Sequence, residues 1–299
     1  MHKRFNVPPG LVGPFYMVWS CLLFVCLWVL IRIATETMHP FIVILFRSVF
    51  ALMALAPFFW REGRSALKTS RFGLHALRGL FATCATFSIF YAVSVVPLAD
   101  LVAITYAAPV FATLGAVVML GERIRMRRIM STFFGFLGVM IVLRPGVEAL
   151  TPGVMIGLFG SIAIAGSLLT IKTLTATEKP QAIVAYSLLF VVPAALVAAA
   201  YVWRMPTWEE LALLALIGIL VSMAQTALTH AFLYGEATQV LPFDFVRLIL
   251  ASLFGIFLFN EPVDLWTWVG GAVILASTIY TAFREARDDH RAPKAGSFG

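Results

Sequence analysis

Ten apolar stretches, each about 20 residues long, follow one another along the chain and constrain its fold more than any other feature. A bilayer core about 30 Å thick is crossed by ~20 residues of α-helix. The stretches cover residues 13–32, 40–60, 72–96, 99–120, 127–145, 152–172, 180–203, 208–234, 236–260 and 263–283. Prolines that the first turn of a helix accepts stand near several of their starts, at Pro14, Pro40, Pro152, Pro180 and Pro262. The pattern predicts an all-α integral membrane protein with ten transmembrane helices.

The composition excludes a soluble domain. Hydrophobic residues make up 61% of the 299 residues and charged residues 12%, whereas a soluble domain is about half apolar and about a quarter charged. Too few charges are present to form a polar shell, so a lipid bilayer is the predicted surrounding. The formal charge of +7 is spread over short clusters between the apolar stretches, which indicates membrane topology and not a nucleic-acid partner.

The Lys and Arg residues predict the orientation of the chain, because loops on the cytoplasmic side carry an excess of them. With the N-terminus inside, the clusters at 61–71, 123–128 and 284–294 all fall on the cytoplasmic side. The opposite side receives Arg32, Arg144 and Arg204, and membrane depth receives Arg47, Arg78 and Arg247. Both termini are therefore predicted to be cytoplasmic. The expected location, which the charges do not decide, is a bacterial inner membrane.

Five spans in each half make the two halves insert in opposite orientations, so we expect inverted repeats. An offset of 139 residues pairs Gly79 with Gly218 and places Glu122 opposite Glu261, each just before the next helix. The predicted units are a first five-helix repeat at 1–148, a second at 149–285 and a disordered cytoplasmic tail at 286–299.

The chain resembles the EamA-type branch of the ten-helix drug/metabolite transporter superfamily. The resemblance is carried by LHALRGLFATCATFSIFYAVSVVPLADLVAITYAAPVFATLGAVVMLGERI in the first half and by THAFLYGEATQVLPFDFVRLILASLFGIFLFNEPVDLWTWVGGAVI in the second. It implies a secondary transporter with a solute site near the midplane and alternating access between two rocking halves. Family members carry amino acids, nucleotide sugars, riboflavin, adenosyl-methionine and other metabolites, so the family alone selects no substrate.

Charges at membrane depth are the first candidates for a solute site, because each costs several kcal/mol unless it faces a cavity or a partner. Asp244 and Arg247 lie three residues apart on one helix face of the ninth stretch. Either they form a self-neutralised packing pair, or Arg247 attracts an anionic group while Asp244 attracts an amine or takes up a proton. Arg47 has no charged neighbour within a helical turn, and we expect it to face the cavity.

Further hydrogen-bonding or aromatic groups lie in the third, fourth, eighth and ninth stretches, which are expected to line the site: Tyr91, Thr105, Tyr106, Gln225, Thr229, His230, Gln239 and Phe245. Each polar member taken alone could instead satisfy a backbone carbonyl. His75 and Arg78 are interpreted as a cluster at the water boundary. Pro242 predicts a kink in the ninth stretch. Cys21, Cys26 and Cys84 are interpreted as small apolar residues.

Sequence motifs favour transport over other functions. Motifs of metal-dependent hydrolysis, nucleophilic catalysis and phosphate binding are absent, so no enzyme activity, metal or cofactor is expected, and ATP is not the direct energy source. The expected cargo is an amino acid or related zwitterionic or anionic solute, moved by export. A broad exporter of amphipathic drugs, or a membrane sensor or scaffold, is the alternative. The oligomeric state stays open between monomer and homodimer.

Overall fold

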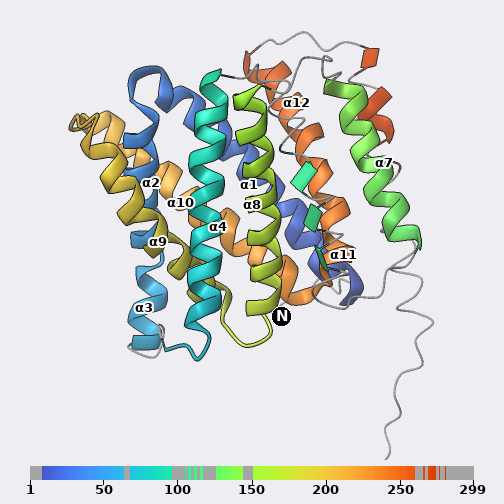
Figure 1. Cartoon of the computed structure of the whole chain (residues 1–299), viewed down its shortest axis with the longest axis horizontal. Helices are drawn as coiled ribbons and strands as arrows, with labels where there is room; N and C mark the ends of the chain where they lie inside the picture. The colour runs from blue at the N-terminus through green and yellow to red at the C-terminus, as the bar shows by residue number, and fades with distance from the viewer. Residues whose placement is uncertain are drawn as a thin grey trace, which may run out of the picture.

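The computed structural model describes residues 9–63, 68–95, 126–143 and 151–259, with scattered residues between 105 and 116 and between 265 and 280. Helices form nearly all of this part of the chain (Figure 1). Their bounds are α1 Pro9–Thr37, α2 Pro40–Ala54, α3 Ala56–Glu62, α4 Phe72–Val95, α7 Met126–Leu143, α8 Pro152–Leu174, α9 Pro180–Ala200, α10 Trp208–Tyr234, α11 Ala237–Val240, the 3-10 helix η2 Leu241–Phe245, and α12 Val246–Phe259.

Eight of the predicted stretches are helices in the described residues. Three of these helices begin at a proline, as predicted. Pro40, Pro152 and Pro180 each begin a helix. Most of the predicted fourth and tenth stretches lies outside the described residues, as does Pro262. Five helices in the described part are long and apolar enough to cross a membrane, namely Gly10–Thr37, Pro40–Glu62, Met155–Leu174, Pro180–Ala200 and Trp208–Tyr234.

Pro14 does not begin the first helix as predicted, because α1 already starts at Pro9. A proline has no N–H, so Pro14 cannot donate to the carbonyl of Gly10 four residues earlier. Gln239 of α11 donates its Nε2 to that carbonyl at 2.7 Å. Because Pro14 cannot bond this carbonyl, a side chain from the second half of the chain can donate to it.

Successive described spans that a short loop joins run in opposite directions through one bundle, with α2 and α3 forming one span. In Figure 1, α1 and α4 begin and α3 and α8 end at the lower end of the bundle. Exposed Arg61, Lys68 and Lys179 lie in segments at this end, whereas Arg204, near the end of α9, pairs with Glu210 at the start of α10. Helix α8, which is equivalent to α1 by the offset of 139, runs antiparallel to it, as inverted repeats require.

The packing of helices follows the same two-fold relation. The largest interface of α1 is with α10, and the largest interface of α4 is with α8; the repeat offset exchanges these two pairs. It also exchanges the α2–α10 and α4–α9 contacts, while α2 and α9 pack on each other. Each half therefore completes the core of the other, and the two repeats form one interlocked unit.

Candidate solute-binding site

The ninth span is broken shortly after its start. Its helix stops after Val240, continues as the five-residue 3-10 segment η2 and resumes as α12. Pro242 explains the break, because it removes one donor of the α-helical ladder. All five residues of η2 are buried. Irregular backbone at membrane depth is tolerated only where protein or a cavity covers it, so the predicted kink lies inside the protein.

Asp244 and Arg247 form an ion pair at the end of this break, with Arg247 Nη2 donating to Asp244 Oδ1. The Asp244 side chain is 11% exposed and the Arg247 side chain 27%. The Arg247 guanidinium carbon lies 4.8 Å from the ring centre of Phe24 in α1, within cation–π range. The pair therefore satisfies its own charge, which is the neutral state that the packing interpretation expected.

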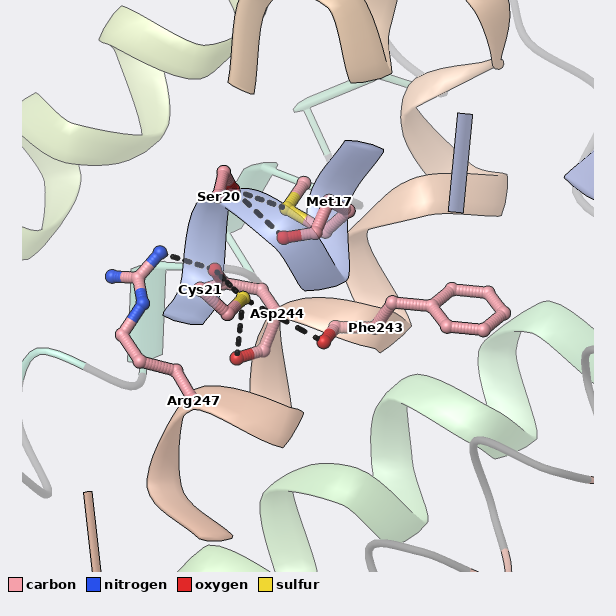
Figure 2. Close-up of polar contacts among 6 residues, drawn as sticks. All are labelled: Met17, Ser20, Cys21, Phe243, Asp244 and Arg247. Atoms are coloured by element: carbon pink, nitrogen blue, oxygen red, sulfur yellow. Dashed lines mark hydrogen bonds and ion pairs between the residues drawn. The ribbon is translucent and has the colours of Figure 1, made fainter. Parts of the chain in front are cut away.

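Cys21 of α1 points at the same carboxylate (Figure 2). Its Sγ lies 3.6 Å from Asp244 Oδ1, 3.8 Å from the Asp244 carbonyl and 3.9 Å from the Phe243 carbonyl. A thiol is a weak donor, and here it faces three acceptors of the 3-10 segment η2. The sequence interpretation of Cys21 as a small buried residue holds for its burial, but it missed this contact.

Arg78 joins the two halves across the bundle. Its Nη2 donates to Gln225 Oε1 of α10 at 3.2 Å, and its side chain is 3% exposed. His75, one turn earlier in α4, is also buried; its ring centre lies 4.2 Å from that of Tyr186 in α9. The sequence interpretation put His75 and Arg78 near the water boundary, and it did not show that the protein buries both side chains.

Arg47 of α2 faces the same helix, α4, nearer the upper end. Its guanidinium carbon lies 5.7 Å from the ring centre of Phe90, and its buried Nε has no hydrogen-bond partner. No described carboxylate lies within ion-pair distance of Arg47 or Arg78. The two arginines therefore bring uncompensated positive charge into the described interior.

Three of the predicted residues bond backbone carbonyls. Thr229 donates its Oγ1 to the Gln225 carbonyl at 2.8 Å, and His230 Nδ1 lies 2.8 Å from the Thr226 carbonyl, both within α10. Gln239 bonds the Gly10 carbonyl. These side chains have the structural partners that the alternative interpretation described.

The remaining predicted residues occupy different surroundings. Phe245 is fully buried, and its ring fills the space that a Cβ at Gly135 of α7 would take. Tyr91 is 49% exposed on α4. Thr105 is half-buried, and Tyr106 lies outside the described residues.

A shallow apolar groove of about 350 Å³ between α1, the α2–α3 junction and α10 lies apart from these charges. It is lined by Tyr16, Trp19, Ala54, Leu55, Phe58, Gln181, Ser222, Met223, Thr226, Ala227 and His230. Within the described part of the chain, no group of three His, Cys, Asp or Glu side chains could hold a metal ion.

The arrangement of spans matches a known family in both halves. The model of the EamA-like transporter family matches residues 11–144 and again residues 151–283. The chain belongs to the EamA-like transporter family. The double match to one unit agrees with the exchange of helix contacts between the halves of this EamA-like protein.

Curated relatives of this EamA-like protein are transporters. The S-adenosylmethionine uptake transporter of Rickettsia bellii is 31% identical over 84% of this chain and 86% of its own length. The riboflavin transporter of Brucella anthropi is 32% identical over 82% of this chain and 89% of its own length. The pseudopaline exporter of Pseudomonas aeruginosa is 27% identical over 84% and 88%. The protein is therefore a membrane transporter of a small solute.

A solved crystal structure has the same fold. It superposes with a TM-score of 0.75 over 94% of this EamA-like chain and 98% of the other chain, at 18% sequence identity. At this identity the likeness shows the fold alone.

Proposed function

We propose that this EamA-like protein is a secondary transporter of a small zwitterionic or anionic metabolite, with amino acids and related compounds as the first class of cargo. It works by alternating access in the bacterial inner membrane, with both termini in the cytoplasm. The two five-helix halves rock around a central site, and the direction is export.

The observation that carries this proposal is the Asp244–Arg247 pair at the broken turn of the ninth span. A buried ion pair offers one group of each sign, so a zwitterion can exchange partners with both members at once. The neighbouring 3-10 backbone is a natural hinge, because a short 3-10 segment often marks a functional hinge in a helix. The contact with Cys21 couples this turn to α1.

The relatives support a metabolite as cargo and include both directions of transport. One is named for S-adenosylmethionine, whose amino-acid end is zwitterionic, and one for riboflavin. One is an exporter and another an uptake protein. The test of direction therefore needs both orientations of the membrane.

The first experiment is a thermal-shift screen of the purified protein against amino acids, their amides and esters, and amphipathic drugs. A bound solute raises the unfolding temperature by mass action. Stabilisation by free amino acids or carboxylates, and none by their esters and amides, which lack the carboxylate, supports the proposal. Stabilisation by the drugs alone supports a broad drug exporter instead and contradicts it.

The second experiment measures transport of the stabilising solute in right-side-out and inside-out membrane vesicles. Asp244→Asn and Arg247→Gln are each expected to reduce transport by about tenfold or more, because each removes one charge-assisted partner of the solute. Arg204→Gln is the matched control, since it removes a cation from an exposed pair with Glu210. Normal transport by both site variants would end the proposal.

A further inference from the structure

Arg78 is a buried cation that the protein leaves partly unsatisfied. Its side chain is 3% exposed and makes one hydrogen bond, to the neutral amide of Gln225. Its Nε is buried without a hydrogen-bond partner. Burying a charge without an opposite charge costs several kcal/mol, so something other than the described protein groups must compensate this one in the working transporter.

The nearby carboxylate of Glu178 is already engaged elsewhere. Its Oε1 accepts a hydrogen bond from Thr69 Oγ1 at 2.6 Å and lies 3.9 Å from His75 Nε2. It makes no ion pair with Arg78. Glu178 therefore ties the α8–α9 turn to the start of α4, and the guanidinium one turn deeper is left to Gln225.

Three other cations in the described residues have carboxylate partners. Lys179 pairs with Glu62 at 2.7 Å, Arg204 with Glu210 at 2.6 Å, and Arg247 with Asp244. Arg78 and Arg47 have no carboxylate partner among the described residues. Arg78 lies where α4 and α10, from opposite halves, meet.

We infer that Arg78 and Gln225 form an anion-binding subsite, where the guanidinium binds a carboxylate or phosphate group of the transported solute. A guanidinium presents several N–H donors in one plane, and one is used by Gln225. The Gln225 carboxamide holds the guanidinium through its oxygen and can direct its N–H2 group at the same anion. This inference rests on the proposed function and deepens it by naming a second cation, besides Arg247, that recognises negative charge on the solute.

The test places a thiol beside Arg78 without removing the arginine. Gln225→Cys is made with Cys26→Ala and Cys84→Ala, while Cys21 is retained and its background rate subtracted, since it is fully buried. The purified protein is treated with two methanethiosulfonates, one carrying a sulfonate and one a trimethylammonium group. Each rate is divided by that reagent's rate with a free thiol in solution.

We expect the anionic reagent to react about tenfold or more faster than the cationic one after this correction, because a positive cavity concentrates anions. Arg78→Lys in the same background should keep the preference, and Arg78→Gln should abolish it. Ala176→Cys, in the exposed α8–α9 turn, is the control and should show little preference. Failure of both reagents to react at position 225, or a preference unchanged in Arg78→Gln, would overturn the inference.

A phospholipid headgroup is the other source of the same anionic chemistry. The labelling is therefore repeated in nanodiscs of phosphatidylcholine with and without phosphatidylglycerol. Equal rates in both support a solute site. Suppression of the anionic reagent by phosphatidylglycerol assigns the subsite to lipid and contradicts a role in solute binding.

Gln225→Glu gives a readout that needs no ligand or reagent. It supplies a carboxylate at the position that now lies 3.2 Å from the guanidinium, so we expect a higher unfolding temperature than that of the parent protein. Gln225→Leu should lower it. A lower unfolding temperature for Gln225→Glu would show that the Arg78 guanidinium has no need of a negative charge at this position, and would contradict the inference. These outcomes do not depend on transport, so the inference and the proposed function can fail separately.

Discussion

Gly79 of α4 and Gly218 of α10 make equivalent close contacts in the two halves of the protein. A Cβ at Gly79 would lie 2.5 Å from Phe190 Cβ in α9, and a Cβ at Gly218 would lie 2.5 Å from Phe50 Cβ and 2.8 Å from Ala51 N in α2. Ala51 and Phe190 are themselves 139 residues apart, as the two glycines are. The repeat relation therefore reaches the level of single packing contacts.

Gly218→Ala is predicted to destabilise the protein, because the added methyl group meets backbone atoms of α2 that cannot move alone. Overpacking of this kind costs about 1–3 kcal/mol. Gly79→Ala, which meets a side chain, should cost less. Thermal unfolding in detergent measures both against Gly73→Ala, whose Cβ would meet nothing within 4 Å. Unfolding temperatures equal to that of the Gly73 variant would contradict the packing argument.

The buried pair of Asp244 and Arg247 should show strong energetic coupling. Removing one member takes from the other its opposite charge inside the protein, and breaking a buried pair in this way costs about 3–5 kcal/mol. The double variant Asp244→Asn/Arg247→Gln should therefore be more stable than either single variant. The measurement is a double-mutant cycle of unfolding temperatures. Additive losses would show that the pair is not formed, and the exposed pair of Arg204 and Glu210 is the control, with little change expected.

Lys172 of α8 is predicted to hold the junction between α10 and α11 closed. Its Nζ donates to the carbonyls of Phe232 at 3.0 Å and Gly235 at 2.6 Å. These carbonyls lie at the C-terminal end of α10, where no further helical N–H groups follow to bond them. Lys172→Met should speed amide hydrogen exchange in peptides that cover 232–240. Lys179→Met, which removes the surface pair with Glu62, is the matched lysine control. Unchanged exchange in the Lys172 variant would refute the assignment.

Arg47 and Tyr91 should respond differently to substitution, although the sequence assigned both to the solute site. Arg47→Gln removes an interior cation with no described carboxylate partner and is expected to reduce transport by about tenfold. Tyr91→Phe changes a side chain that is 49% exposed and should leave transport near normal. Initial rates in vesicles, corrected for the amount of protein, decide this. A larger loss of transport for Tyr91→Phe than for Arg47→Gln would contradict this prediction.

Spans of the bundle were predictable from hydropathy and proline positions because both act locally along the chain. The stretches at 40–60, 72–96 and 208–234 became Pro40–Glu62, Phe72–Val95 and Trp208–Tyr234. The prediction for Pro14 was wrong because a proline near the beginning of an apolar stretch was taken as the first residue of the helix, whereas α1 begins at Pro9. The donor that compensates for this proline, Gln239, lies in the other half of the chain.

The site was only partly predictable. Asp244 and Arg247 share one helix face at a spacing of three residues, so their ion pair could be expected from the sequence. Helical periodicity says which residues share a face and leaves open which face meets lipid and which meets protein. The sequence therefore did not show that the His75 and Arg78 side chains are buried in the protein, or that Tyr91 is 49% exposed. Cys21 offered no sequence signal, because a small apolar residue is its usual interpretation.

The amino-acid sequence by itself determined that lipid surrounds this protein, how long its spans are and by what offset its halves repeat. Hydrophobic transfer and helix geometry decide these features, and both depend on neighbours within about 20 residues. Tertiary structure alone decided that Arg78 meets Gln225, 147 residues away, and that Cys21 meets the Asp244 side chain, 223 residues away. These pairs form because two inverted halves pack into each other, and buried polar groups then take whichever partner the opposite helix brings within reach.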